Sequence, residues 1–297
     1  MLLLTGATGL VGSALLRRLV AEGTQVRCLV RDPRRLGAQR VRVQIALGDL
    51  TDPPSFRNAM RGVHTVVHLA ASIRDQPRGS IEELNGIATW RMVRAAQRAG
   101  VERFVFFSVL GASTHHRARF FRAKALAEQA VAEADLRSTV FAPSIVYAPG
   151  DPWLTLLERM ALLPVMPVSG RGHAAYQPIW ADDVADCVIA GLHAPAPDGR
   201  RDTTERFELA GPQTLSQDEI VRLVLRSQNR NRLLLHVPTP IVSRGLRLLQ
   251  ATMGQRAFAT WDEAELMEVP MISGRGAADT EVLGVTPQAM GAVLGTG

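Results

Sequence analysis

The feature that most constrains the fold is a glycine-rich segment near the N-terminus, TGATGLVG, which begins at Thr5. It follows an apolar run that predicts a strand and precedes an amphipathic stretch that predicts a helix. In this context Gly6 permits a tight turn, Gly9 lets a pyrophosphate approach the backbone, and Gly12 lets the helix pack on the strand. The N–H groups at the start of the helix attract phosphate. The segment therefore predicts a dinucleotide site, with contacts from Thr5, Gly6, Thr8, Gly9, Leu10, Val11 and Gly12.

Short apolar runs alternate with amphipathic stretches through the first half of the chain, which indicates βαβ units. We expect strands at 2–5, 26–30, 41–47, 65–69, 104–108 and 139–142, and helices at 12–22, 54–61, 81–99 and 119–134. The strand runs are apolar on both faces, as in a parallel sheet with helices on each side. The predicted fold class is α/β, a doubly wound parallel (Rossmann) sheet with a smaller C-terminal lobe. Its core spans 1–150, completed by about 174–195, and the lobe spans about 151–173 and 196–297.

The second half has a different rhythm. Residues 182–192 and 216–226 predict helices, the latter with Ser216 and Glu219 as a capping box, and 207–209 predict a short strand. Residues 153–168 form a long, mostly apolar stretch, and 240–253 predict a basic amphipathic helix. Each of these two segments either forms the core of the lobe or docks on a protein complex or a membrane surface.

Composition excludes several classes of protein. The 34 basic residues outnumber the 28 acidic ones, but they are dispersed, and aromatic residues are only 5%, so no nucleic-acid surface is expected. No apolar run reaches the roughly 18 residues of a transmembrane helix, and the N-terminal segment lacks the basic region of a signal peptide. The two cysteines, Cys28 and Cys187, are too few for a disulfide framework or a zinc site. We expect a cytoplasmic protein without a metal, and peripheral membrane association is an alternative.

The end of the second strand bears on the choice of cofactor. An NAD site places an acid about 20 residues after the loop, where it binds the ribose hydroxyls. Here Arg31 follows Gly12 by 19 positions, with Arg34 and Arg35 behind it. Their guanidinium groups suit a 2′-phosphate, so NADP(H) is favoured. NAD(H) stays open, because a small shift in register brings Asp32 into the pocket, and Arg34 and Arg35 are also explained as plain surface charge.

Three segments together resemble the short-chain dehydrogenase/reductase superfamily: TGATGLVG, the GDL sequence at 48–50, and HLAA at 68–71. The ADDVA sequence at 181–185 is similar to its extended and atypical branches. The resemblance implies that Asp49 and Leu50 contact the adenine. It also implies that the backbone at Leu69, Ala70 and Ala71 passes along the cofactor. The PSIVYAPG segment, with Pro143 and Ile145, resembles the part of the family that lies beside the nicotinamide.

The resemblance also implies catalytic positions. Ser108 ends the fifth strand, where the family has its catalytic serine, and residues 120–124 occupy the place of its Tyr-x-x-x-Lys motif. The tyrosine transfers a proton, the lysine lowers its pKa and holds the ribose, and the serine orients the carbonyl. Position 120 is Phe120, which has no proton to give. Lys124 is nevertheless kept, and it is the only lysine among 34 basic residues.

The retained lysine indicates a cofactor site, although a lysine on a solvated helix face is the alternative. His115, His116 or Tyr147 are candidate replacement acids, but we expect Tyr147 to pack against the cofactor instead.

An atypical branch of the superfamily also has an arginine after the second strand and a replaced tyrosine. It includes the NAD(P)H-binding accessory subunit of respiratory complex I, and the FELAGP segment at 207–212 is similar to it. This resemblance implies a nucleotide-binding structural, assembly or quinone-related factor. Two alternatives stay open. One is an active NADP(H)-dependent reductase or epimerase, acting on a small carbonyl, quinone or nucleotide-sugar. The other is a sensor that binds a regulatory partner according to the level of NADPH.

Overall fold

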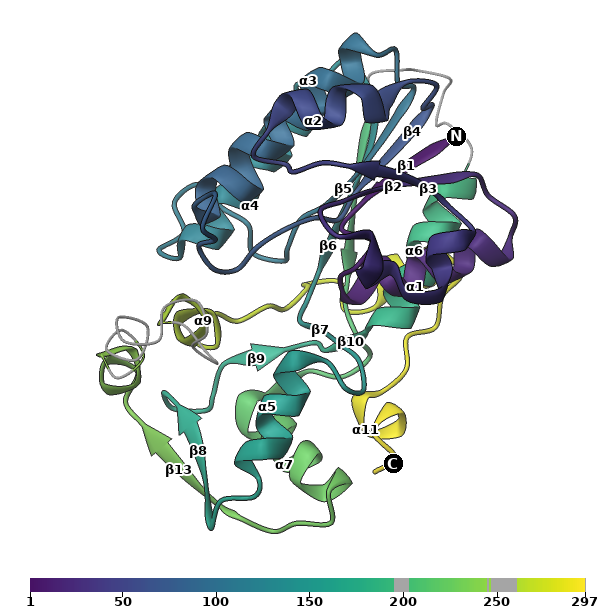
Figure 1. Ribbon diagram of the computed structural model, residues 1–297. Coiled ribbons are helices and arrows are strands. Elements are labelled where there is room, and N and C mark those ends of the chain that lie inside the picture. Colours follow the sequence, from purple (N-terminus) through teal and green to yellow (C-terminus); the bar gives the residue numbers. More distant parts are fainter. Residues whose placement is uncertain (195–202, 245, 247–260, 297) are drawn as a thin grey trace.

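The computed structural model describes residues 1–194, 203–244, 246 and 261–296, and its centre is a seven-stranded sheet (Figure 1). The strand order is β11-β6-β5-β4-β1-β2-β3, with every pair parallel. The strands are β1 (Leu2–Thr5), β2 (Val26–Val30), β3 (Gln44–Leu47), β4 (Thr65–His68), β5 (Arg103–Phe107), β6 (Arg137–Pro143) and β11 (Thr204–Leu209). This is the α/β, doubly wound parallel sheet that the sequence predicts.

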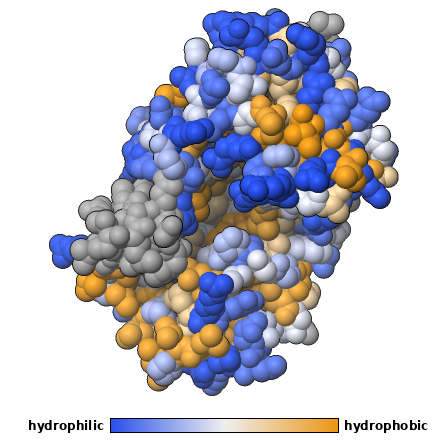
Figure 2. Space-filling model, viewed as in Figure 1, coloured by the Kyte–Doolittle hydropathy of each residue, from blue (hydrophilic) through white to orange (hydrophobic). Residues whose placement is uncertain are grey.

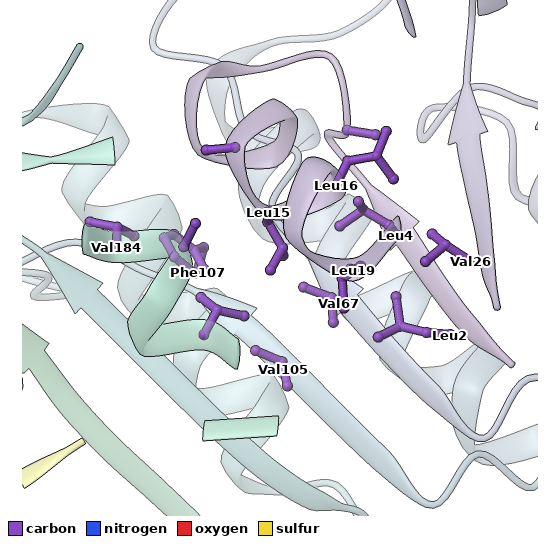
Figure 3. Packing of buried hydrophobic residues seen from close by; sticks show 14 of the residues in the cluster. Leu2, Leu4, Leu15, Leu16, Leu19, Val26, Val67, Val105, Phe107 and Val184 are labelled. Carbon is purple, nitrogen blue, oxygen red and sulfur yellow. The ribbon is translucent and has the colours of Figure 1, made fainter. Parts of the chain in front are cut away.

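Helices cover both faces of the sheet because its strands are apolar on both sides. On one face α1 (Leu10–Ala21) and α6 (Ala181–His193) bury a cluster that contains Leu2 and Leu4 (Figure 3). Leu3 points to the other face, where it joins side chains from α2 (Pro53–Arg57), α3 (Ala88–Arg98) and α4 (Arg119–Ala132). This alternation along β1 fixes which helices cover which face.

The order of the strands places the nucleotide site. The chain builds the sheet outward from β1 through β2 to β3, and then returns to add β4, β5 and β6 on the other side of β1. A doubly wound sheet leaves a crevice at such a switch point, beyond the carboxyl ends of its strands. In Figure 1 these ends of β1, β4, β5 and β6 face the smaller lobe.

The smaller lobe has its own apolar core. Its main elements are β7 (Val146–Tyr147), α5 (Pro152–Met160), β8 (Val165–Ser169), β9 (Ala175–Tyr176), β10 (Ile179–Trp180), β12 (Leu215–Ser216), α7 (Gln217–Ser227) and β13 (Leu233–Val237). Three short helices follow: α9 (Trp261–Leu266), α10 (Ala278–Val282) and α11 (Met290–Val293). Leu154, Met166, Tyr176 and Val224 meet in this core. The predicted capping box is present on α7, where Ser216 and Glu219 bond each other's backbone N–H groups.

The structure differs from several predicted boundaries. The strand predicted at 41–47 begins only at Gln44, because Asp32 caps a 3₁₀ segment, Pro33–Val41, ahead of it. The helix predicted at 81–99 begins with a π-helical turn, Glu83–Ile87. The apolar stretch 153–168 divides into α5 and β8.

Two further segments concern the smaller lobe. The strand predicted at 207–209 is the end of β11. It pairs with β6 at the edge of the central sheet, although the sequence analysis assigned 196–297 to the lobe. Most of the predicted helix 240–253 lies outside the described residues; within them, 239–244 and 246 are helical.

Candidate nucleotide site

The three glycines of the loop after β1 have different roles. Gly6 has φ +72°, and a Cβ there would lie 2.7 Å from the backbone nitrogen of Ala70. A Cβ on Gly12 would lie 2.0 Å from the carbonyl oxygen of Gly6. The fold itself therefore requires both. Gly9 is exposed, has an ordinary φ of −84°, and its Cβ would meet only the Gly6 oxygen, at 3.2 Å. Gly9 is the one of the three whose open side is free for a ligand.

The start of α1 offers backbone N–H groups to that ligand. Gly9 is the N-cap and has no side chain to bond them, and the first turn contains no acidic residue. The Gly9 N–H donates to the Gly6 oxygen at 2.9 Å, which fixes the turn. Thr8, Leu10 and Val11 are partly exposed around it. These are the features of a helix start that binds phosphate.

A buried polar chain stabilises the loop from beneath. The Ala70 N–H donates to Thr5 Oγ1 at 3.3 Å, and Thr5 Oγ1 lies 2.7 Å from His68 Nδ1. His68 Nε2 lies 3.1 Å from Thr89 Oγ1, which donates to the Asn85 carbonyl at 2.6 Å. Because Thr89 donates its hydroxyl proton to Asn85, it accepts from Nε2–H of His68. Burial and the nearby Lys124 lower the pKa of His68 to about 3. Sequence reasoning missed this chain, because no spacing relates its members.

The end of β2 presents arginine to solvent. Arg31 is exposed, and in the described part of the chain it has no ion pair. Asp32 is engaged elsewhere: it accepts from the backbone N–H of Arg34 at 3.0 Å and from its Nε at 2.9 Å. The guanidinium and the N–H of Arg34 lower the pKa of Asp32, so its carboxylate stays charged and capped.

The expected adenine and backbone contacts lie along the neighbouring strand ends. Asp49 Oδ1 accepts from the N–H and the hydroxyl of Thr51, both at 3.0 Å. Asp49 Oδ2 lies 3.9 Å from Arg78. Leu50 packs against the α2–α4 side of the core, Leu69 is partly buried, and Ala71 is exposed. Pro143 and Ile145 lie where the chain leaves β6, and their carbonyls accept from Leu110 at 2.9 Å and Ile179 at 3.0 Å.

Lys124 is buried rather than solvated, with 2% of its surface exposed. Its Nζ donates to the Phe107 carbonyl at 2.5 Å. It lies 4.9 Å from the ring centre of Phe106 and 5.8 Å from that of Phe120. Burial lowers the pKa of Lys124 to about 7, and Glu128 opposes the shift. The solvated-face interpretation of this lysine is wrong. A buried ammonium with one carbonyl acceptor is unfavourable unless another group binds it.

Ser108 has an unsatisfied hydroxyl at the same place. Its backbone N–H donates to the Phe141 carbonyl at 2.8 Å, but its buried Oγ has no hydrogen-bond partner in the described part of the chain. An unpartnered hydroxyl and an ammonium with a single carbonyl acceptor suit the hydroxyl and carbonyl groups of a bound nucleotide or substrate.

The candidate replacement acids have surroundings of their own in the described residues. His115 is exposed and contacts Thr114, and the ring of His116 stacks on Phe121 at 4.4 Å. Burial lowers the pKa of His116. Tyr147 is fully buried in the core of the smaller lobe, where burial raises the pKa of its hydroxyl. Within the described ranges, no hydrogen bond joins these three residues to Ser108 or Lys124.

Phe120 packs against an apolar cluster and stays partly exposed. The buried members of the cluster are Val109, Ala118, Phe121 and Val269, with Leu266, Met271 and Ala112 packed beside them. The segment 261–271 is also tied to the core by ion pairs, Arg117–Glu268 at 3.5 Å and Arg74–Glu263 at 2.5 Å. The cluster members that pack with Phe120 are therefore apolar and donate no proton.

This geometry agrees with the comparisons with known proteins. A family described as NAD(P)H-binding matches residues 6–195, more than half of the chain. The chain belongs to this NAD(P)H-binding family. It is an atypical short-chain dehydrogenase/reductase of the branch that resembles the accessory subunit of complex I.

Two curated relatives and one solved structure illustrate the family. The mitochondrial NADH dehydrogenase [ubiquinone] 1 alpha subcomplex subunit 9 of Arabidopsis thaliana is 29% identical over 74% of this chain and 56% of its own. The ceramide reductase of Caulobacter vibrioides is 30% identical over 65% and 61%. The chain thus spans somewhat more than half the length of each. The dTDP-glucose 4,6-dehydratase DesIV of Streptomyces venezuelae, solved with NAD bound, has a TM-score of 0.74 at 19% identity, covering 100% of this chain and 95% of that one. It shares the fold.

Proposed function

We propose that this protein binds NADP(H) tightly without rapid turnover and acts as a structural, assembly or quinone-related factor. The observation that carries the proposal is the ring of Phe120 next to Lys124 Nζ, where the reaction needs a hydroxyl. Hydride transfer to a carbonyl requires a proton for the oxygen, and a phenyl ring supplies none. The side chains that pack with Phe120 are apolar, so they supply no proton in its place.

The residues around the loop divide the binding task. The open backbone at Gly9 and the start of α1 would hold the pyrophosphate. Arg31 would bind a 2′-phosphate, which favours NADP(H) over NAD(H), because Asp32 is occupied by Arg34. Lys124 would bind the ribose hydroxyls. The bound nicotinamide supplies hydride chemistry where an acceptor and an acid are both present.

Relatives support a role in a complex. The Arabidopsis relative is by name a subunit of a respiratory complex, and it is similar to this chain over most of its residues. The test is to purify the protein, measure its bound nucleotide, and titrate NADPH and NADH into the stripped protein. The proposal expects slow release of NADPH and weaker NADH binding. Equal and weak binding of both nucleotides would contradict it.

A second function is carried by a different observation, the unpartnered hydroxyl of Ser108. A serine that orients a carbonyl keeps such a hydroxyl free, and the Caulobacter relative is by name a reductase. Under this alternative the protein is an NADP(H)-dependent reductase for an apolar carbonyl or quinone, which uses an acid outside the known motif. Consumption of NADPH that disappears in Lys124→Met would favour it.

The NADPH-level sensor requires the same residues as the structural factor. Capture of a partner protein only in the presence of NADPH would distinguish it from a factor that binds its partner at all times.

A further inference from the structure

The smaller lobe has an apolar sheet face that no described segment covers. β8 and β13 pair in parallel, with Leu233 opposite Val165. On the inner side Met166 is buried in the lobe core and Leu234 packs against it. Because side chains alternate along a strand, Leu233 and Leu235 point outward. Their exposed fractions are 79% and 53%, and that of Val165 is 40%.

The turn before β8 extends this surface. Leu162 and Leu163 are 61% and 47% exposed. Together with Val165, Leu233 and Leu235 they form what we call the β8–β13 face. Figure 2 shows hydrophobic residues gathered at the lower left, over β8 and β13. Single exposed leucines are common on protein surfaces, but a contiguous group marks a binding surface.

The charged residues in the segments that form this face are mainly positive. The segments that form it, 155–171 and 226–244, carry six arginines and one acid, Glu158. The arginines are Arg159, Arg171, Arg226, Arg230, Arg232 and Arg244. In the described part of the chain none of the six is paired with an acid. Nearby Asp218 and Glu268 are bonded to His236 and Thr239.

We propose that the β8–β13 face binds the surface of a membrane that contains anionic lipids. The leucines would enter the boundary between headgroups and acyl chains, and the arginines would contact lipid phosphates. A second copy of the chain fits less well, because a symmetric contact sets each face against itself and brings like charges together. No helix in the described residues is both long and apolar enough to cross a bilayer. This inference goes beyond the proposed function, because it does not depend on nucleotide binding.

The test is co-sedimentation of the full chain with vesicles of phosphatidylcholine alone, or of phosphatidylcholine and phosphatidylglycerol in equal parts. We expect binding to the anionic vesicles only, and weaker binding as salt rises. The double variant Leu233→Gln, Leu235→Gln should lose about tenfold in affinity for each leucine. Arg159→Gln with Arg230→Gln should lose about fivefold for each arginine.

The matched control is Val41→Gln with Leu47→Gln. They are 83% and 65% exposed, but Val41 precedes the edge strand β3 and Leu47 ends it, so neither belongs to the β8–β13 face, and vesicle binding should not change. NADPH titration of every variant should give the wild-type affinity, which separates failure of this inference from failure of the proposed function. Three results would overturn the inference: no binding to either vesicle, equal loss in the control, or a wild-type dimer that the leucine variant dissociates.

Discussion

The two ends of the nucleotide site differ in what they retain. At the phosphate end, Gly9 is open, α1 presents unbonded N–H groups, and the chain through His68 holds the loop. At the proposed reaction end, Ser108 and Lys124 are present, but Phe120 occupies the position that the family resemblance assigns to a tyrosine. The difference teaches that nucleotide binding and proton transfer depend on separate side chains, so a chain can keep the first without the second.

The largest effect is expected from a substitution that blocks only the phosphate end of the proposed site. Gly9→Val should lower NADPH affinity about a hundredfold or more, because a side chain there displaces charge-assisted bonds worth about 1.5–3 kcal/mol each. The φ of Gly9, −84°, suits any residue, so the melting temperature of the variant should change little. Fluorescence titration and thermal unfolding measure both.

Gly274→Val is the matched control, since a Cβ there meets nothing within 4 Å. Gly12→Ala should instead destabilise the fold, because its Cβ would lie 2.0 Å from the Gly6 oxygen. Unchanged NADPH affinity in Gly9→Val would mean that the loop does not bind the nucleotide.

Replacement of Lys124 should affect both nucleotide binding and the stability of the fold. Lys124→Met should weaken NADPH binding by roughly tenfold to a hundredfold, the range of a lost hydrogen bond to a charged group. It should also stabilise the empty protein at neutral pH, because it removes a buried charge. In the wild-type protein, NADPH should favour the charged form of Lys124, whose pKa is about 7 without ligand. Calorimetry of the wild type near pH 7, in buffers of different ionisation enthalpy, should therefore show that NADPH binding takes up protons.

The pH dependence has a definite sign. The pKa of Lys124 is about 7 in the folded protein, against its ordinary 10.5. Between these values the unfolded chain binds the extra proton, so the free energy of unfolding rises with pH there. This rise should be absent in Lys124→Met. A variant that melts lower than wild type and binds NADPH normally would make Lys124 a structural residue.

A smaller effect tests the choice of cofactor. Arg31→Ala should lower NADPH affinity about tenfold, the effect of one lost charge-assisted bond, and should leave NADH affinity as it is. Arg40→Ala, which removes an exposed arginine from the adjoining 3₁₀ segment, provides the control. Equal loss for both nucleotides would show that Arg31 does not read the 2′-phosphate.

The smallest effect concerns Ser108. Because its Oγ is buried without a partner, Ser108→Ala should change the free energy of unfolding by less than about 1 kcal/mol. Ser138→Ala is the comparison, since that hydroxyl donates to the Leu136 carbonyl at 3.2 Å. Urea titrations of Ser108→Ala and Ser138→Ala measure the free energy of unfolding of each variant. A larger loss in Ser108→Ala would show that its hydroxyl has a structural role.

The sequence predicted those parts of the fold that depend on neighbouring residues along the chain. The loop from Thr5 to Gly12 was predictable because its glycines stand between a strand pattern and a helix pattern, and the strands were predictable because apolar runs alternate with amphipathic stretches. The position of β11 in the central sheet could not be predicted from the sequence, because residues 204–209 join β6 only through tertiary pairing at the sheet edge. A short apolar run does not reveal which sheet receives it.

The site shows the same limit. The resemblance to the short-chain dehydrogenase/reductase superfamily singled out Ser108, Phe120 and Lys124, but nothing in the sequence indicated that Lys124 is buried. Its burial comes from Phe106 and Phe120 around its Nζ. The apolar cluster against which Phe120 packs includes Leu266 and Val269, about 145 residues away along the chain.

The most direct test of the central claim follows the fluorescence of NADPH bound to the wild-type protein, in the presence of ubiquinone and a small-molecule cell extract. Phe120→Tyr, which restores a hydroxyl four residues before Lys124, and Lys124→Met are run beside it. Our account predicts that the wild-type signal persists for hours and that the recovered nucleotide is still reduced. Oxidised nucleotide from the wild type, but not from Lys124→Met, would contradict it and identify the protein as an active reductase.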